Sequence, residues 1–330
     1  MVTLIIGGAG YLGSCIVEGL IQNGERVKIF DSFMHGIIPK PTKEVEVITG
    51  DITNICQIAK VMKGTDNVIL LAGIVGDPAC SISPEYTRVV NVEASKNVID
   101  LAEDYKIKKL LFASSCSVYG FSEEMELYET SDINPVSLYA KTKADVEKYI
   151  VCTDRDINVD WQIFRLSTLF GYSPRMRFDL VINTLIKSAV LENKINIFGG
   201  DQWRPFVHVR DAAKYFVQTV VHPHMRMREI INIGSFNLRI SEVADELKKI
   251  NKNLNVISDV QNIDNRSYNV SFDKMRFVFG EREHLSILNA YEEIERFIKQ
   301  YNKDEFIKHQ NRYSNDLFTK HYIEVNGLKL

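Results

Sequence analysis

The sequence predicts an α/β protein built around a doubly wound parallel sheet, with a smaller α/β part toward the C-terminus. Three observations predict this class. Short apolar stretches alternate with segments of helical spacing through most of the 330 residues. Glycines directly follow the first apolar stretch, and an acidic residue ends the second. Alternation of this kind is typical of a parallel sheet with helices on both faces.

The first strand and the turn after it form a motif that suits a dinucleotide. Residues 2–6 are apolar, Gly7, Gly10 and Gly13 follow, and helical spacing runs over residues 14–23. Gly7 would allow a sharp turn, Gly10 would let the backbone approach a pyrophosphate, and Gly13 would let the helix pack on the strand. The helix N-terminus would hold the anion. This opening predicts a Rossmann-type unit, the alternative being a tight turn that binds nothing.

Asp31 ends the second predicted strand, residues 26–30. It follows the glycines by about 20 residues, where such sheets place a ribose-binding acid. Its carboxylate would accept hydrogen bonds from the adenosine ribose hydroxyls and would repel a 2′-phosphate. The predicted cofactor is therefore NAD rather than NADP. The alternative is that Asp31 only ends a strand at a turn.

The following units continue the alternation and end in hydroxyl side chains. Because ligands of parallel sheets bind at the carboxyl ends of strands, Ser114, Ser115 and Ser117 are candidate site residues rather than plain helix caps. We expect strands at 45–49, 67–71 and 109–113, helices at 54–62 and 84–105, and a loop at 74–80.

Tyr139 and Lys143 carry the predicted chemistry. They are four residues apart on a helix expected over 138–152, so they share one face. A free phenol is a poor base at neutral pH. A neighbouring ammonium group and the positive nicotinamide of NAD⁺ would lower the pKa of Tyr139, and the phenol could then take a proton from a sugar hydroxyl. The spacing alone is common, but its place behind a dinucleotide loop and a serine-rich turn favours catalysis.

The rest of the chain predicts a substrate-binding part. Arg204 opens a strand, and Asp211 would cap the helix that follows. We expect a domain over 1–174 to which 205–235 return, a substrate part over 175–204 and 236–304, and a tail or extra helix over 305–330. Further expected elements are strands at 159–166, 195–198, 230–234 and 256–260, and helices at 180–192, 241–250 and 288–301.

Composition narrows the classes of partner. Apolar residues make up 45% and charged residues 25%, with a net charge of −3, so we expect neither nucleic acid nor a membrane as partner. No signal peptide is expected ahead of the strand at Val2. Five cysteines without paired spacing favour the cytoplasm, and seven scattered histidines give no metal site.

These motifs together resemble the extended short-chain dehydrogenase/reductase family, over roughly residues 2–300, and within it the NAD-dependent nucleotide-sugar epimerases, dehydratases and dehydrogenases. The resemblance rests on the glycine turn, Asp31, Asp51-Ile52, the Ser114–Gly120 turn, the Tyr139–Lys143 motif and the segment Arg204–Asp211. It implies that 1–174 is the NAD-binding domain and that the smaller part binds a nucleotide sugar.

The resemblance also implies roles for individual residues. Tyr139 would be the base, Lys143 its electrostatic partner and the nicotinamide-ribose anchor, and Ser115 the hydroxyl that bridges substrate and tyrosine. The candidate cofactor contacts are Gly7, Gly10, Tyr11, Leu12, Gly13, Asp31, Ser32, Asp51, Ile52, Leu71, Ala72, Gly73, Asn91 and Lys143. The candidate substrate contacts are Ser117, Thr168, Arg175, Arg177, Asn183, Arg204 and Arg266, with Arg204 on the diphosphate; a solvated basic loop remains the alternative for Arg175 and Arg177.

The sequence departs from this family at several positions. Sugar 4,6-dehydratases carry an Asp-Glu pair where this chain has Cys116 and Ser117, so a dehydratase would lack its acid and base. Thr168 replaces a frequent asparagine. Gln261 stands near the place of a diphosphate-binding arginine, for which Arg266 is a substitute.

We therefore expect an NAD-dependent enzyme that oxidises the C4 hydroxyl of a nucleotide-linked sugar, either as a 4-epimerase or as a C4 dehydrogenase. The stretch 164–183 resembles a branch of bacterial surface-polysaccharide enzymes whose substrates include heptose-type sugars. This resemblance adds a GDP-heptose to the expected substrates. The alternatives are a 4-keto-sugar reductase and a non-catalytic NAD(H)-binding regulator. Apolar residues on the helices at 84–105 and 138–152 predict a homodimer.

Overall fold

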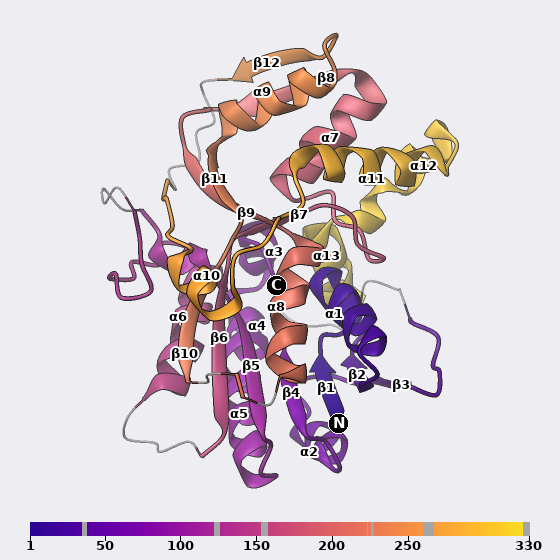
Figure 1. Ribbon diagram of the computed structural model, residues 1–330. Coiled ribbons are helices and arrows are strands. Elements are labelled where there is room, and N and C mark those ends of the chain that lie inside the picture. The colour runs from indigo at the N-terminus through magenta and orange to yellow at the C-terminus, as the bar shows by residue number, and fades with distance from the viewer. Residues whose placement is uncertain are drawn as a thin grey trace.

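The computed structural model describes residues 1–34, 38–121, 126–152, 158–222, 224–225, 228–259 and 267–325. It confirms the expected α/β class. A seven-stranded sheet forms the lower body in Figure 1, and a second group of short strands and helices lies above it.

All seven strands of the main sheet run parallel, in the order β10-β6-β5-β4-β1-β2-β3. Because β1 lies between β2 and β4, the crossovers leave it in opposite directions and open a crevice at the carboxyl ends of the strands. The strands are β1 (Val2–Ile6), β2 (Arg26–Asp31), β3 (Val45–Thr49), β4 (Asn67–Leu70), β5 (Lys109–Ser115), β6 (Asp160–Leu166) and β10 (Glu229–Ile233).

Alternate residues of β1 enter two cores on opposite faces of the sheet, as the two-residue period of a strand requires. Ile5 packs with α1 and α8 on one face, whereas Leu4 and Ile6 pack with α2 and α5 on the other. A Cβ at Gly19 of α1 would stand 2.8 Å from Val217 of α8, so these two helices pack closely. The covering helices are α1 (Tyr11–Gln22), α8 (Val209–Val221), α2 (Ile55–Met62), α5 (Ala94–Asp104) and α6 (Leu138–Val151).

The segment between β4 and β5 differs from expectation in two places. The expected loop at 74–80 contains a short helix, α3 (Asp77–Ile82), in which Pro78 occupies the first turn, where its missing N–H is not needed. The helix expected at 84–105 is continuous, but a π-helical turn (Val89–Glu93) lies in it between α4 (Pro84–Arg88) and α5. Such π-helical turns occur mostly at functional sites.

The second group contains two small sheets and the helices α7, α9 and α11, whereas α10 packs against β10 of the main sheet. β9 pairs with β7 and β11, and β8 pairs with β12. The sequence did not predict β7, β11 or α10. These elements are β7 (Thr168–Phe170), β8 (Lys194–Phe198), β9 (Trp203–His208), β11 (Phe236–Arg239), β12 (Asn255–Asp259), α7 (Val181–Glu192), α9 (Ile240–Ile250), α10 (Asp273–Phe279) and α11 (Ile287–Lys299).

The prediction that Asp211 caps α8 is wrong. His208 is the cap, because its Nδ1 accepts a hydrogen bond from the N–H of Arg210 at 3.3 Å. Asp211 lies inside the first turn, where it is fully buried and accepts from the N–H of Leu285 at 2.6 Å. This carboxylate therefore ties α8 to the segment before α11.

The chain ends in two helices, α12 (Lys303–His309) and α13 (Asn315–Val325), joined by a 3-10 turn over Gln310–Tyr313. Phe178 stands edge-on to both Phe306 and Tyr313, with ring centroids 5.6 and 5.5 Å away. Its N–H also donates to the carbonyl oxygen of Tyr313 at 2.8 Å. These contacts fix the start of α13, which packs on α3.

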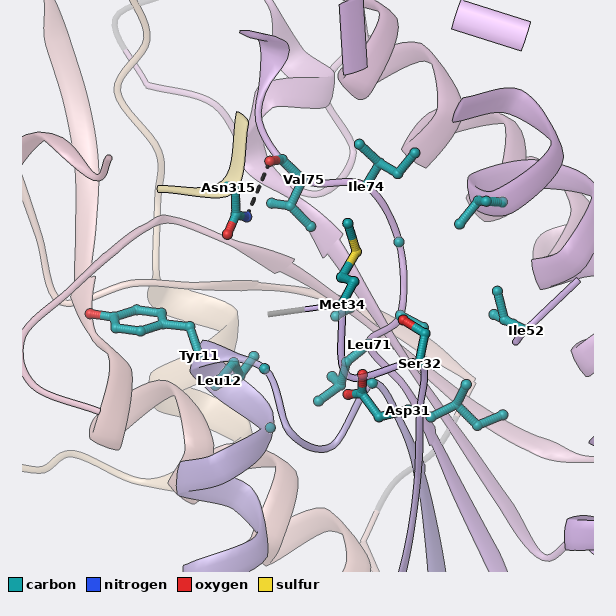
Figure 2. A pocket seen from close by; sticks show the side chains of 18 of the residues that line it. Tyr11, Leu12, Asp31, Ser32, Met34, Ile52, Leu71, Ile74, Val75 and Asn315 are labelled. Atoms are coloured by element: carbon teal, nitrogen blue, oxygen red, sulfur yellow. Dashed lines mark hydrogen bonds between the residues drawn. The ribbon is translucent and has the colours of Figure 1, made fainter. Parts of the chain in front are cut away.

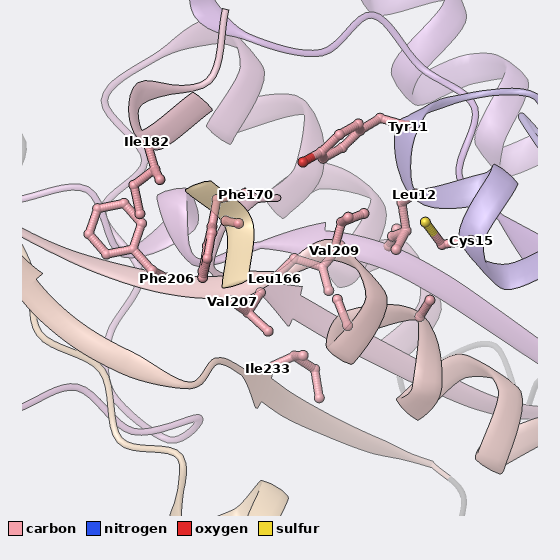
Figure 3. Packing of buried hydrophobic residues seen from close by; sticks show 14 of the residues in the cluster. Tyr11, Leu12, Cys15, Leu166, Phe170, Ile182, Phe206, Val207, Val209 and Ile233 are labelled. Atoms are coloured by element: carbon pink, nitrogen blue, oxygen red, sulfur yellow. The ribbon is translucent and has the colours of Figure 1, made fainter. Parts of the chain in front are cut away.

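A continuous apolar cluster joins the two parts of the molecule. Figure 3 shows Leu12 and Cys15 of α1 near Leu166 at the end of β6, and Phe170 of β7 near Phe206 of β9. None of the helices in the described ranges is long and apolar enough to cross a membrane.

Candidate active site

The glycine turn between β1 and α1 has the close geometry that its spacing predicts. Gly7 has a φ of 90°, which disfavours other residues. A Cβ there would lie 2.6 Å from the N atom of Ala72, and a Cβ at Gly13 would lie 2.6 Å from the carbonyl oxygen of Gly7. The first turn of α1 contains no acidic residue. Its N-terminus therefore faces the crevice with the polarity that attracts an anion.

Asp31 stands opposite this turn, at the end of β2. One carboxylate oxygen accepts from the N–H of Ala9 at 3.0 Å, and the other accepts from the N–H of Phe33 at 2.9 Å. Burial raises the pKa of Asp31, and these N–H groups oppose the increase. A carboxylate has further lone pairs, so both oxygens can still accept hydrogen bonds from hydroxyl groups of a ligand.

A cavity of about 200 Å³, called the first cavity below, runs along the carboxyl ends of β1, β2 and β4. Figure 2 shows Asp31, Ser32 and Leu71 around it. Twelve of the predicted cofactor contacts line it: Gly7, Gly10, Tyr11, Leu12, Gly13, Asp31, Ser32, Asp51, Ile52, Leu71, Ala72 and Gly73.

Asn91 and Lys143, also predicted as cofactor contacts, do not line the first cavity. Asn91 is buried behind it and binds the main chain of Ile74 twice, accepting from its N–H at 2.7 Å and donating to its carbonyl at 2.9 Å. Asn91 therefore fixes the loop after β4. Lys143 donates to the carbonyl oxygen of Ala113 at 2.8 Å, below the wall of the cavity.

Tyr139 and Ser115 come together as the sequence predicts. The hydroxyl of Ser115 is hydrogen-bonded to the phenol of Tyr139. Burial raises the pKa of Tyr139, Cys80 and Asp77 raise it further, and the cation of Arg177 lowers it. The expected lowering by Lys143 is not seen: the cation that lowers the pKa of Tyr139 is Arg177, and burial lowers the pKa of Lys143 itself to about 8.

A second cavity, of about 560 Å³, adjoins the first. Tyr139, Ser114 and Arg177 line both. Ser117 has a buried Oγ without a hydrogen-bond partner among the described residues. Four of the predicted substrate contacts line this cavity: Ser117, Thr168, Arg177 and Arg204.

The structure does not place the other predicted substrate contacts there. Arg175 lines the first cavity instead, where its Nη2 donates to Oδ1 of Asn315 at 2.7 Å. Asn183 lines neither cavity. Its amide oxygen accepts a hydrogen bond from the N–H of Gly171, and its amide nitrogen donates to the carbonyl oxygen of Arg177 and to the hydroxyl of Tyr11. Arg266 lies outside the described residues.

A buried ion pair supports the floor of the site. Glu147 of α6 and Arg165 of β6 are each about 5% exposed, and Nη2 of Arg165 lies 2.8 Å from Oε2 of Glu147. Ser114 also donates to Glu147, and Arg165 donates to the hydroxyl of Tyr119 at 2.9 Å. The network locks α6, which carries Tyr139, to the strand that carries Ser115.

Sequence reasoning missed several residues that line the cavities. Asp77 and Asp316 line the second cavity, and Asn315, Thr319 and Tyr322 line the first. Asn315, Thr319 and Ile323 of α13 are buried at every fourth position, but two of them are polar, so apolar spacing does not indicate this helix. Within the described ranges, no three His, Cys, Asp or Glu side chains are grouped so that they could hold a metal ion.

Comparison with known proteins identifies what this arrangement resembles. A family model described as "NAD dependent epimerase/dehydratase family" matches residues 3–234. A putative UDP-glucose 4-epimerase of Methanocaldococcus jannaschii is 30% identical over 250 residues, which is 74% of this chain and 81% of that protein.

Solved structures share the fold at lower identity. The UDP-glucose 4-epimerase of Thermotoga maritima, solved with UDP-glucose, is 21% identical with a TM-score of 0.82 over 91% of this chain and 99% of its own. A UDP-glucuronic acid 4-epimerase of Bacillus cereus, solved with UDP-glucuronic acid and NAD, is 24% identical with a TM-score of 0.79 over the same shares.

Proposed function

The chain belongs to the NAD-dependent epimerase/dehydratase family of nucleotide-sugar enzymes, and from this premise we propose that it oxidises the C4 hydroxyl of a nucleotide-linked sugar to a 4-keto species. The observation that carries the proposal is the position of Tyr139. Its phenol stands where the two cavities meet and is hydrogen-bonded to Ser115.

The first cavity fits NAD. Its glycine turn leaves no room for a Cβ beside Ala72, so the backbone can approach a diphosphate closely. Asp31 offers carboxylate oxygens for ribose hydroxyls at the far end of the sheet. When bound, NAD accepts the hydride that leaves C4 and can return it to the keto carbon.

Tyr139 would act as the base. Ser115 orients the phenol, and Arg177 supplies the positive charge that favours the phenolate. The charged nicotinamide would lower the pKa further, so Tyr139 would gain its basic form mainly when NAD⁺ is present. Lys143 would hold α6 in place through its hydrogen bond to the carbonyl oxygen of Ala113.

The second cavity would hold the nucleotide sugar. Arg204 lines it beside Tyr268, with the guanidinium 5.6 Å from the ring centroid, and a guanidinium suits two phosphate oxygens at once. Ser117 would donate its unused Oγ hydroxyl to the sugar. A UDP-sugar is the first substrate to test, since the named relatives act on or bind UDP-glucose and UDP-glucuronic acid; a GDP-heptose remains the alternative.

Dehydration is disfavoured. Cys116 replaces the acid that a dehydratase needs, and burial raises the pKa of its thiol to about 12. Its Sγ donates to the carbonyl oxygen of Arg165 at 3.2 Å, within the core. Cys116 therefore has neither the position nor the acidity to protonate a leaving hydroxyl.

Product analysis tests the proposal. Purified protein is incubated with UDP-glucose, UDP-glucuronic acid and the GDP-, dTDP- and CDP-sugars, and the sugars are examined by NMR while NADH absorbance is followed. A new C4 epimer without net NADH identifies a 4-epimerase, whereas NADH with a keto product identifies a dehydrogenase. The protein is also tested for reduction of 4-keto sugars by NADH. If neither these sugars nor the nucleotide sugars react, the C4 proposal is wrong, and a non-catalytic NAD(H)-binding regulator becomes the better account.

A homodimer and a cytoplasmic location belong to the same proposal. The predicted interface is formed by α4, α5 and α6, where Val89 and Val151 are exposed apolar side chains. The free thiols of all five cysteines suit a reducing compartment. Light scattering at micromolar concentration tests the dimer, and a monomer would overturn it.

A further inference from the structure

Helix α13 borders the first cavity although it comes last in the chain. Asn315, Thr319 and Tyr322 line the cavity together with residues of β1, β2 and β4. On its other side α13 packs on α3. Helix α13 therefore borders the cavity in which the cofactor is proposed to lie, and its residues line both ends of that cavity.

One end is joined through Asn315. Its Oδ1 accepts from Nη2 of Arg175 at 2.7 Å, and its Nδ2 donates to the carbonyl oxygen of Val75 at 3.4 Å. Figure 2 shows Asn315 reaching Val75 across the cavity from Asp31. Arg175 and Asn315 are only 1% and 7% exposed, so water does not compete for this link.

Arg175 also has an unused donor. Its Nε is buried and has no hydrogen-bond partner among the described residues. Burial and the neighbouring cation of Arg177 together lower the pKa of Arg175 to about 10, although the carboxylates of Asp179 and Asp31 oppose this decrease. Since Asp179 is bound to Arg177 at 2.6 Å, the charge of Arg175 is left to stabilise a further anion in the cavity. The cofactor diphosphate is such an anion.

The other end is joined through Tyr322. The Tyr322 hydroxyl is hydrogen-bonded to Tyr86 of α4 and to Asp51, and all three side chains line the first cavity. Asp51 follows β3 and is one of the predicted cofactor contacts. The hydroxyl of Tyr322 therefore ties α13 to the wall of the cavity at the end away from Arg175.

We infer that α13 is a clasp over the cofactor site, in which Asn315 positions Arg175 on the cofactor diphosphate and Tyr322 closes the adenine end. NAD then leaves only when α13 detaches. A cofactor retained between turnovers receives its hydride back from the same site, so the clasp favours the 4-epimerase over the net dehydrogenase. This consequence rests on the proposed function, whereas retention itself is measured without any sugar.

Cofactor release tests the clasp. Full-length protein, Asn315→Ala and Tyr322→Phe are loaded with labelled NAD, and its loss to excess unlabelled NAD is followed. Each substitution removes hydrogen bonds to a charged partner, so release should be about tenfold faster than in the unsubstituted protein. Lys320→Ala, on the exposed side of the same helix, should release NAD at the unsubstituted rate. Thermal unfolding of each cofactor-free variant separates faster release from misfolding.

Release at one common rate in all four proteins would overturn the clasp, as would exchange of NAD within seconds in the unsubstituted protein. If a folded Tyr322→Phe protein releases NAD faster while no nucleotide sugar is converted, the clasp stands and the C4 proposal fails. If a sugar is converted but Asn315→Ala and Tyr322→Phe release NAD no faster, the C4 proposal stands and the clasp fails.

Discussion

The ammonium group of Lys143 donates a hydrogen bond of 2.8 Å to the main-chain carbonyl oxygen of Ala113. This bond joins α6, which carries Tyr139, to the end of β5, which carries Ser115. The Lys143 Nζ lies 5.8 Å from the centroid of the Tyr139 ring, on the same helical face. The lysine therefore helps to fix the position of the phenol, while burial raises the pKa of Tyr139 and Arg177 opposes this increase.

Removing the Tyr139 hydroxyl should abolish turnover and spare the fold. Tyr139→Phe keeps the ring and loses the proton acceptor, so the rate should fall by about 10²–10⁴-fold. NAD binding should persist, which fluorescence titration would measure. Tyr149→Phe is the matched control, since Tyr149 lies on the same helix and bonds Asp100 away from both cavities. Near-normal turnover in Tyr139→Phe would exclude Tyr139 as the base.

Lys143 should be costly for stability and needed for activity. Burial lowers the pKa of Lys143 to about 8, below the ordinary 10.5. Below pH 8 the folded state therefore contains a buried positive charge, which reduces the free energy of unfolding. Stability should rise as pH increases from about 8 to about 10.5, by up to about 3 kcal/mol.

Lys143→Met removes that cost, and we expect the cofactor-free variant to unfold at the same or a higher temperature at pH 7 and to lack the rise toward pH 10. Turnover should nevertheless fall sharply. Lys141→Met, on the exposed face of α6, should change neither quantity. A strongly destabilised Lys143→Met protein at pH 7 would contradict this account.

Asp31 should set the preference for NAD over NADP. Asp31→Asn keeps an oxygen for the N–H groups of Ala9 or Phe33 but removes the negative charge. We expect NAD to bind about tenfold more weakly and NADP to bind more tightly than in the unsubstituted protein, because the repulsion of the 2′-phosphate is gone. Paired titrations with both cofactors measure the ratio, and an unchanged ratio would remove Asp31 from the ribose site.

The Glu147–Arg165 pair should matter for folding more than for chemistry. Glu147→Gln leaves a buried guanidinium without its counter-charge, and the free energy of unfolding should fall by about 3–5 kcal/mol in denaturant titrations. Replacing both residues, by Glu147→Leu with Arg165→Met, should recover much of this loss. The exposed pair Glu246 and Lys249 is the control, and Glu246→Gln should have little effect. Equal effects at the two pairs would contradict the argument.

The main sheet could be predicted because its strands are buried runs with glycine or hydroxyl residues at their ends. The misses have physical reasons. β7 and β11 have only three and four residues, too few to show a period. In α13 the buried face carries Asn315 and Thr319, so apolar spacing does not reveal the helix.

The cofactor site could be predicted further than the substrate site. The glycine turn and Asp31 follow regular strands, so their spacing fixes their positions. Arg175 lies in the irregular stretch after Gly171 and Asn183 in the first turn of α7, and sequence spacing there does not tell which cavity a side chain enters. Asn91 lies behind the wall of the first cavity and does not line it. The π-helical turn directs its amide to the main chain of Ile74 instead.

One isotope experiment tests the central claim most directly: hydride transfer at C4 with Tyr139 as the base. The full-length protein with NAD is incubated with UDP-glucose deuterated at C4, or with the sugar found active in the panel. The account predicts that the epimerised product retains deuterium at C4, that turnover of the deuterated sugar is slower, and that Tyr139→Phe forms no product. Replacement of the C4 deuterium by solvent hydrogen, or product formed without any cofactor, would contradict the account.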